Sequence, residues 1–492
     1  MTQAAQTPKD ILIIGSGVGG LTAGIILAKL NHRVTVVEKN PLPGGLMRSY
    51  TRDGIDCPVG VHYMGSLDSG QPLRRLWDYL CVTPLIPLER MGKEGVIDRY
   101  IFDDFAFNLP EGINAFEENL KSSFPGENSR ITSIINDLRH TSGVLSSLDI
   151  LISPAMTFLS PESFTSMGEH LLRIGCSARL RNVLGVPSTL IGVPLEECPA
   201  FYYHMTLASY LLSSWRLACS SSHMADAFVS RLTTLGGEVL TGDGVEKILI
   251  ESGKVKGVVL QSGRTMTATV IIAAIHPGTV AAMLPGDALR ATYAERITQL
   301  ENTKGLFGVN LAVDASAHAA LPYNIYQLYP EDGVLSRGIF HQLRRSGQEG
   351  INLLSMITTS SIAEWDTWKG TASGQRDRDY VDAKEEKARQ FIGEATKLFG
   401  RLKGEKILDI YTPLTIRDWV HSPDGSAYGI LRSTRQVMKT AFLKRTLIEG
   451  LFLAGQNSLA PGIMGTMLAS FQTVRNIIGH ERFRREVMGD FL

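Results

Sequence analysis

The chain has 492 residues, enough for about three domains of ordinary size and for a large buried core. Its 49 basic residues balance its 49 acidic residues, and this zero net charge disfavours nucleic acid, whose binding requires a clustered basic excess. With 44% hydrophobic and only 20% charged residues, the chain is not globally disordered. A neutral surface suits self-association or contact with lipid, so a homo-oligomer and peripheral membrane contact both stay open.

The cysteines and the apolar runs indicate the compartment. The five cysteines are odd in number and widely spaced, with no C-x-x-C pair, so we expect neither a disulfide framework nor a metal site. The polar start MTQAAQTPKD does not resemble a secretory signal, and no internal run offers about 18 clean apolar residues. We therefore expect a reducing, cytoplasmic location, with any membrane association peripheral.

The first elements in chain order predict a βαβ unit. Residues 11–14 form a continuous apolar run typical of a buried parallel strand, and the turn GSGVGG follows it directly. The helical pattern LTAGIILAKL comes next, and VTVVE at 34–38 supplies a second strand. This order of strand, glycine turn, helix and strand is typical of a doubly wound sheet.

Later segments predict a discontinuous architecture. Residues 236–275 alternate short β-branched runs with glycine turns, which favours a small antiparallel layer that returns to the sheet through VIIAA. LFLAG at 451–455 predicts another strand, followed by a helix. Residues 120–220 have helical spacing, and 300–405 end in a charged helix. No repeat or low-complexity linker separates these pieces, so we expect interleaved domains.

The glycine turn carries the first chemical motif. Gly15, Gly17 and Gly20 match G-x-G-x-x-G between a strand and a helix, the arrangement that places a pyrophosphate on a helix N-terminus. Glu38 ends the second strand 18 residues after Gly20, where a carboxylate accepts hydrogen bonds from an adenosine ribose. A nicotinamide or a flavin dinucleotide would satisfy this pattern equally well.

Further segments of the sequence favour a flavin over a nicotinamide dinucleotide. The chain resembles the flavin-dependent amine-oxidase and phytoene-desaturase superfamily, in which a glycine pair follows the acidic strand end. Within it the chain is most similar to the carotenoid desaturase, carotenoid isomerase and retinol saturase branch. The resemblance rests on PGG at 43–45, GVHYMG at 60–65, YTPLTIRDWVHSPDGSAYGI at 411–430, LFLAG at 451–455 and PGIMGTMLASFQTV at 461–474.

The resemblance implies FAD as cofactor and a role for each matching position. Many relatives carry Arg directly after the glycine pair, where this chain has Leu46, and Arg48 is the candidate substitute. The implied contacts are Gly15, Gly17 and Gly20 with the pyrophosphate, Glu38 with the adenosine ribose, Gly44 and Gly45 with the phosphate side, Val245 with adenine, Gly455 with the ribityl chain, and Met464 and Gly465 with the pyrimidine edge of the flavin. Gly19, Lys39 and Arg48 are further candidate cofactor-binding residues.

The resemblance also implies the fold. We expect an α/β protein with a Rossmann-like FAD-binding domain of the GR2-type flavoproteins and an interleaved α+β substrate-binding domain. The predicted boundaries are 1–115, 220–300 and 405–492 for the FAD-binding domain, and 116–219 and 301–404 for the substrate-binding or lid domain. Two apolar segments, 148–159 and 205–218, occupy the place where relatives form a lipophilic tunnel. Core helices are the default interpretation of both, and membrane docking is the alternative.

His62 and Tyr63 are the candidate catalytic residues, because the matched family segment lies against the flavin and histidine exchanges protons near neutral pH. Both could instead only shape the cavity. The leading hypothesis is an FAD-dependent oxidoreductase that saturates, desaturates or isomerises carbon–carbon bonds of a hydrophobic polyene or isoprenoid-like lipid by hydride exchange with flavin N5. The alternatives are an amine or amino-acid oxidase and a non-catalytic, lipid-binding flavoprotein.

Overall fold

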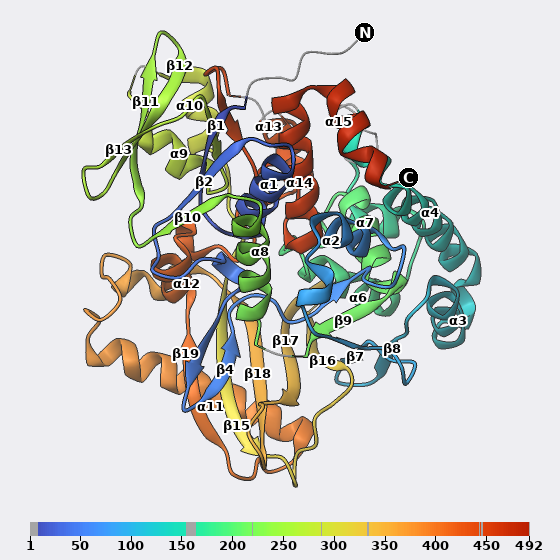
Figure 1. Cartoon of the computed structure of the whole chain (residues 1–492). Helices are drawn as coiled ribbons and strands as arrows, with labels where there is room; N and C mark the ends of the chain where they lie inside the picture. The colour runs from blue at the N-terminus through green and yellow to red at the C-terminus, as the bar shows by residue number, and fades with distance from the viewer. Residues whose placement is uncertain are drawn as a thin grey trace.

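The computed structural model describes residues 8–491, apart from 154–163, 219, 287, 332–333, 442 and 444–445. Figure 1 shows an upper body that contains a parallel sheet and a lower body that contains a larger, mainly antiparallel sheet. The chain passes between the two bodies repeatedly, so each sheet combines segments that are far apart in sequence. The predicted α/β class and interleaved organisation are confirmed.

The upper sheet has five parallel strands with β1 at its centre. Alternate side chains of β1 enter two different cores, with Ile11 and Ile13 on one face and Leu12 and Ile14 on the other. A strand buried on both faces must be apolar throughout, which explains the continuous run in the sequence. The strand order is β10 (Glu238–Thr241), β2 (Arg33–Glu38), β1 (Asp10–Ile14), β14 (Val270–Ala273) and β20 (Leu451–Leu453).

Helices cover one face of this sheet, and a small antiparallel sheet covers the other. The helical face comprises α1 (Val18–Lys29), α8 (Ser222–Thr234) and α14 (Gly462–Ile478), flanked by α2 (Pro72–Leu80) and α15 (His480–Glu486). The opposite face carries β11 (Val245–Glu251), β12 (Lys254–Leu260), β13 (Thr265–Thr267), α9 (Pro277–Met283) and α10 (Ala291–Thr298). The antiparallel layer expected within 236–275 starts only at β11, because β10 pairs in parallel with β2.

The lower sheet has seven strands and packs against the charged helix expected near residue 400. The core between them contains Phe307 and Val309 of the sheet and Ala388 and Phe391 of α11 (Arg378–Phe399). The strand order is β19 (Lys406–Tyr411), β15 (Gly305–Asp314), β18 (Ile351–Ser360), β17 (Val334–Arg345), β16 (Asn324–Glu331), β7 (Asp98–Ile101) and β8 (Ala106–Leu109).

The helices expected from the spacing of residues 120–220 complete the lower body beside β16 and β17. They are α3 (Ile113–Ser123), α4 (Asn128–Ser147), α5 (Met167–Arg173), α6 (Ala178–Thr189) and α7 (Ala200–Leu212). The remaining elements are β3 (Ser49–Arg52), β4 (Ile55–Pro58), β5 (Met64–Gly65), β6 (Leu88–Arg90), β9 (Ser214–Leu217), α12 (Pro413–Val420) and α13 (Val437–Ala441). Of the apolar segment 148–159, residues 154–159 lie outside the described part of the chain.

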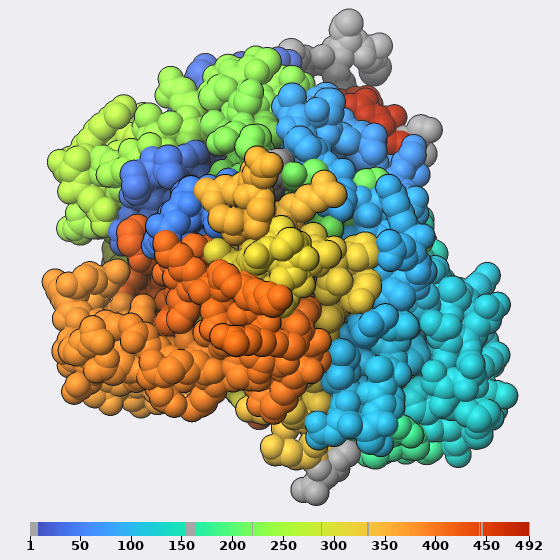
Figure 2. All heavy atoms as spheres, turned by 90° about the horizontal axis from the view of Figure 1, so that it is seen from below, coloured from blue at the N-terminus to red at the C-terminus, as the bar shows by residue number. Residues whose placement is uncertain are grey.

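The strand pairing differs from the predicted domain boundaries at two places. β7 pairs with β16 and β19 pairs with β15, so both belong to the lower sheet although the boundaries 1–115 and 405–492 place them with the upper one. Figure 2 shows the blue segment around residue 100 alongside the yellow and orange segments between 300 and 420. Pairing over such sequence distances leaves no local pattern, so the sequence could not reveal it.

The described residues contain no helix that is both long enough and apolar enough to cross a bilayer.

Candidate functional site

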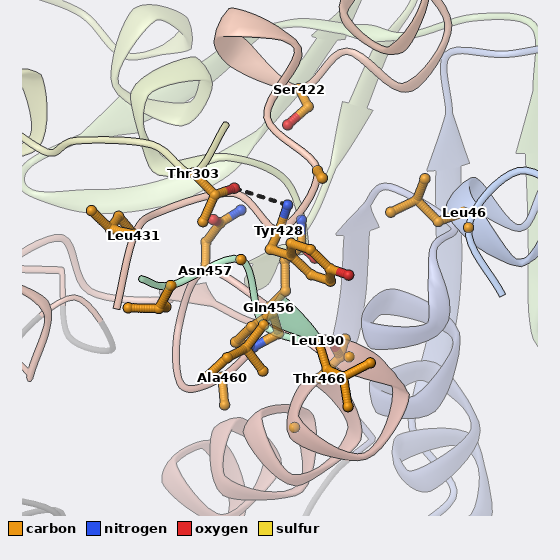
Figure 3. A pocket seen from close by; sticks show the side chains of 18 of the residues that line it. Leu46, Leu190, Thr303, Ser422, Tyr428, Leu431, Gln456, Asn457, Ala460 and Thr466 are labelled. Atoms are coloured by element: carbon orange, nitrogen blue, oxygen red, sulfur yellow. Dashed lines mark hydrogen bonds between the residues drawn. The ribbon is translucent and has the colours of Figure 1, made fainter. Parts of the chain in front are cut away.

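A cavity of about 1130 Å³ lies between the two bodies. The loops that leave the carboxyl ends of four parallel strands line it, at Gly15 after β1, Lys39 after β2, Ala274 after β14 and Ala454 after β20. Ligands of open α/β sheets bind at this edge, where neighbouring connections diverge. In Figure 3 the side chains of Leu46, Leu190, Tyr428 and Thr466, which are far apart in sequence, are grouped around the same part of this cavity.

The glycine turn between β1 and α1 forms one wall. Gly15 adopts a φ of +96°, and a Cβ at Gly20 would collide with the carbonyl oxygen of Gly15, so the tight turn requires both glycines. A Cβ at Gly17 would meet no atom within 4 Å, and one at Gly19 would lie 2.7 Å from the Cα of Gly455. Gly15, Gly17 and Gly19 line the cavity, whereas Gly20 packs behind it.

Two helices begin at this cavity without a capping side chain. The N-cap of α1 is Gly17 and that of α14 is Pro461, and neither offers a side-chain hydrogen bond to the first backbone N–H groups. Free N–H groups and the positive end of the helix dipole favour a negatively charged ligand. The cavity is therefore suited to an anion at the glycine turn and to a second electron-rich group at Met464 and Gly465.

Glu38 connects the glycine turn after β1 with the loop after β2. These two loops form what we call the glycine end of the cavity. The Oε2 atom of Glu38 accepts hydrogen bonds from the backbone N–H of Ser16 at 3.1 Å and the Ser16 hydroxyl at 2.6 Å. Its Oε1 atom accepts one from the N–H of Asn40 at 2.8 Å, and the Ser16 hydroxyl accepts one from Gly44. An ionised carboxylate accepts about four hydrogen bonds, so one position remains for a ligand hydroxyl. Glu38 and the adjacent Lys39 both line the cavity.

The glycine pair and Arg48 have different positions. Gly45 lines the cavity and faces Gly17, whereas Gly44 packs so closely on Ala225 of α8 that a Cβ would collide with it. Arg48 does not line the cavity, because its guanidinium donates to the carbonyls of Leu42 at 2.8 Å and Gly45 at 3.3 Å. Burial lowers its pKa. Arg48 thus ties the loop together from behind, unlike the direct cofactor contact that we predicted.

The remaining predicted cofactor residues reach the cavity from three other segments. Val245 lines it at the start of β11, Gly455 after β20, and Met464 and Gly465 at the start of α14. The structure therefore gathers residues from positions 15 to 465 around one space, as the resemblance requires. Among the predicted cofactor residues, Gly20, Gly44 and Arg48 lie behind the wall instead of on it.

The other end of the cavity is built from apolar side chains. Leu190 follows α6, Met205 comes from α7, and Leu328, Leu335 and Phe340 come from the hairpin of β16 and β17. Leu328 is buried within the helical core of the lower body, and Met205 and Phe340 pack against that core. These side chains offer no hydrogen bonds, so a molecule at this end is held by shape and by burial of apolar surface.

His62 and Tyr63 lie where the two ends meet. His62 lines the cavity 5.6 Å from the ring of Phe340, and its Nδ1 atom has no hydrogen-bond partner among the described residues. Burial lowers the pKa of His62 to about 4, with a further contribution from the positive charge of Arg344. The imidazole is therefore neutral at pH 7, so His62 lacks the proton-donating capacity that we expected of a histidine with an ordinary pKa.

Tyr63 belongs to a buried polar cluster that the sequence did not reveal. Its hydroxyl donates to Asp98 at 3.0 Å and is 2.8 Å from the hydroxyl of Tyr326. Asn324 donates to the other oxygen of Asp98 at 2.8 Å and accepts from Gln342. Burial raises the pKa of Asp98 to about 7, although its two hydrogen bonds oppose the shift. The alternation of Asp98 and Tyr100 in β7, with both side chains buried, is the sequence signal for an inward carboxyl group.

Comparison with known proteins agrees with this geometry. Residues 13–80 match the sequence profile of an NAD(P)-binding Rossmann-like domain. The fold resembles the crystal structure of an oxidoreductase from Methanosarcina mazei, with a TM-score of 0.67, 16% identity and coverage of 95% of this chain and 99% of that one. It also resembles a CLA-producing fatty acid isomerase from P. acnes, with a TM-score of 0.63, 14% identity and coverage of 97% and 100%. The fold and the site thus define a Rossmann-type protein with a second, interleaved domain.

The sequence relatives are more specific. The chain is 25% identical to an all-trans-retinol 13,14-reductase of Macaca fascicularis, over 94% of this chain and 85% of that protein. It is 25% identical to a chloroplastic prolycopene isomerase of Daucus carota, over 94% of this chain and 78% of that protein. It is 26% identical to a 4,4'-diapophytoene desaturase of Methylomonas sp, over 62% of this chain and 61% of that protein. The chain is thus similar in sequence to a retinol reductase, a carotenoid isomerase and a carotenoid desaturase, in agreement with the resemblance of its motifs.

Proposed function

We propose that this protein is an FAD-dependent oxidoreductase that acts on carbon–carbon bonds of a hydrophobic polyene or isoprenoid-like lipid. The observation that carries the proposal is the single cavity with two unlike ends. Its glycine end offers an anion cradle and a buried carboxylate, and its other end offers apolar walls. A polyene has almost no polar groups, so a lining of this kind is what its binding requires.

The residues of the glycine end fit FAD. The turn at Gly15 to Gly19 and the N-terminus of α1 would hold the pyrophosphate, and Glu38 would accept a ribose hydroxyl through its remaining position. The N-terminus of α14 at Met464 and Gly465 would stabilise negative charge on the flavin ring. Bound FAD would supply hydride chemistry, while the protein supplies position, electrostatics and exclusion of water.

The relatives support a polyene over an amine. The named reactions of the retinol reductase, the desaturase and the isomerase all concern double bonds of retinoids or carotenoids. A putrescine oxidase and a cyclohexylamine oxidase are similar in structure, but they are only 13% and 17% identical to this chain, so the likeness shows the fold alone. Saturation, desaturation and isomerisation use the same arrangement of flavin and lipid, so the proposal extends to the three reactions as a class.

Anaerobic spectroscopy of the FAD-loaded protein tests this function. The oxidised flavin is mixed with saturated or partly desaturated polyenes, and the reduced flavin with conjugated polyenes, and the flavin absorption is followed. We expect bleaching or recovery of the flavin bands with at least one lipid. A flavin that no polyene reduces or reoxidises, but that an amine reduces, would overturn the proposal in favour of amine oxidation.

The cofactor has a simpler test. Protein purified with excess FAD and freed of unbound ligand is expected to retain the flavin absorption spectrum. A colourless protein that still unfolds cooperatively would contradict FAD binding at this site.

Location and assembly follow from the same proposal. Leu172 and Val334 line the cavity, yet they are 56% and 41% exposed, so the apolar end opens at a surface with apolar side chains. Contact of this opening with a membrane would let a water-insoluble substrate enter directly. We propose a cytoplasmic protein with peripheral membrane contact and self-association. Flotation with phospholipid vesicles and light scattering test the two contacts separately.

A further inference from the structure

A chain of hydrogen bonds runs from a buried carboxyl group to the cavity wall. Asp98, only 1% exposed on β7, accepts from the hydroxyl of Tyr63, which lies 2.8 Å from the hydroxyl of Tyr326. Tyr63 and Tyr326 both line the cavity, whereas Asp98 lies behind them. The three residues come from a loop before β5, from β7 and from β16.

In the described part of the chain, no cation contributes to the pKa shift of Asp98, although a buried carboxylate is usually paired with one. In the described part of the chain, the titratable groups that interact electrostatically with Asp98 are Tyr63, Tyr100, Tyr210 and Tyr326. Its second oxygen accepts from the neutral amide of Asn324. A carboxyl group in such a place exchanges a proton at a small cost in free energy, because neither ionisation state is strongly favoured near neutral pH.

The protonation state of Asp98 sets the direction of the whole chain. When Asp98 is ionised, Tyr63 donates to Asp98 and Tyr326 donates to Tyr63. When Asp98 is protonated, it donates to Tyr63, Tyr63 donates to Tyr326, and the hydroxyl hydrogen of Tyr326 is free for a group in the cavity. Protonation of Asp98, which is two hydrogen bonds away from Tyr326, therefore makes Tyr326 a proton donor towards the cavity.

We propose that Asp98, Tyr63 and Tyr326 form a proton relay. While one lipid carbon exchanges a hydride with the flavin, the relay exchanges a proton with the neighbouring carbon. The inference rests on the proposed function, since it assigns the proton that hydride exchange alone leaves unaccounted for. Tyr326 is the catalytic residue, Tyr63 relays the proton, and Asp98 is a positioning residue that stores it.

The reaction balances in atoms and electrons. In the direction of saturation, one carbon of the double bond takes a hydride and its two electrons from reduced flavin, and the neighbouring carbon takes a proton from the Tyr326 hydroxyl. Tyr326 regains a proton from Tyr63, and Tyr63 regains one from Asp98, which becomes a carboxylate. The double bond is reduced and the flavin is oxidised. Desaturation runs the same transfers in reverse, with Asp98 as the final proton acceptor.

Three variants test the relay in the FAD-loaded protein. Tyr326→Phe and Asp98→Asn are expected to slow the reaction between flavin and polyene by about 10²–10⁴-fold, the usual contribution of a general acid or base. Tyr100→Phe is the matched control, because Tyr100 is a buried neighbour on the same strand that does not line the cavity, and the wild-type rate is expected. Flavin content and reduction by dithionite confirm that each variant folds.

The pH profile separates a relay from a merely structural role. The wild-type rate of saturation is expected to fall as the pH rises through about 7, because Asp98 then loses the stored proton. In Asp98→Asn this step in the profile is expected to disappear, while Tyr100→Phe keeps it. If Asp98→Asn does not fold, Tyr63→Phe takes its place in the comparison of rates.

Infrared difference spectroscopy gives a readout without turnover. The carbonyl stretch of a protonated carboxyl group is expected to titrate near pH 7 in wild type and in Tyr100→Phe, and to be absent in Asp98→Asn. A band missing from wild type, or a Tyr326→Phe variant as fast as a reactive wild type, overturns the relay. A wild-type flavin inert towards every polyene overturns the proposed function instead, and the infrared titration still reports on Asp98.

Discussion

The two ends of the cavity are built in opposite ways. The glycine end consists mainly of backbone: the turn at Gly15, the free N–H groups of α1 and α14, and one carboxylate, Glu38, that fixes the loops. The apolar end consists of side chains from α6, α7, β16 and β17, with the polar cluster of Asp98 beside it. Changes at the glycine end should therefore affect cofactor binding, and changes at the apolar end should affect the lipid and the proton.

The largest expected effect is that of Gly20→Ala. Its Cβ would collide with the backbone oxygen of Gly15, which cannot move without opening the turn, so the cost should exceed about 3 kcal/mol, the upper range for overpacked sites. We expect loss of FAD retention together with a lower melting temperature, measured by absorption and circular dichroism. Gly17→Ala is the control: its Cβ meets no atom within 4 Å, so the fold should persist while FAD binding weakens. Equal stability of the two variants would refute the close packing at Gly20.

Glu38→Ala should have the next largest effect. It removes a charged acceptor from Ser16 and Asn40 as well as from the ribose, and hydrogen bonds to charged groups contribute about 1.5–3 kcal/mol each. We expect FAD affinity to fall by at least about tenfold in an equilibrium titration of flavin fluorescence. Unchanged affinity would exclude Glu38 from the ribose role, and Glu38→Gln should give an intermediate value.

Leu335→Asn tests the opposite end. It replaces an apolar group of the cavity wall, so we expect the affinity for a polyene to fall by about tenfold at unchanged FAD affinity, since a buried CH₂ contributes about 0.8 kcal/mol. Leu85→Asn, at an exposed position away from the cavity, is the matched control and should match wild type in both measurements. A Leu335→Asn variant that loses FAD but keeps the lipid would invert the comparison.

The last prediction concerns the dependence of stability on pH. The pKa of Asp98 is raised from 3.8 to about 7 in the folded protein, so the folded state binds more protons than the unfolded state between these values. Asp98 should therefore lower the free energy of unfolding by about 1.4 kcal/mol per pH unit as the pH rises through this interval. Asp98→Asn should remove this contribution in melting experiments at pH 5 and 8, and Asp78→Asn, exposed on α2, should retain the wild-type slope.

The same contrast explains what the sequence could predict. The strands and the glycine turn of the upper sheet depend on short, continuous patterns, so the βαβ unit was predicted correctly. Most of the residues predicted to bind the cofactor line the cavity, and their contact with FAD stays a prediction. Arg48 was placed on the wall because sequence distance alone cannot show that the carbonyls of Leu42 and Gly45 would hold its guanidinium behind the loop.

The apolar end depends on contacts that no short pattern encodes. Tyr63 meets Asp98 and Tyr326 only because β7 pairs with β16, a strand more than 200 residues away in the chain. The shift in the pKa of His62 is caused by burial in the assembled core, which the residue type alone could not show. Local motifs thus predicted the fold around the glycine turn, and only the assembled structure revealed the polar cluster of Tyr63, Asp98 and Tyr326.

A crystal structure of the protein with FAD and a bound polyene would test the central claim most directly. We expect the pyrophosphate at the turn from Gly15 to Gly19, the flavin ring beside Met464 and Gly465, and the lipid against Leu335 and Tyr326 in the same cavity. A lipid bound elsewhere, or a flavin ring separated from it by the wall of the lower body, would show that the cavity does not bring cofactor and lipid together.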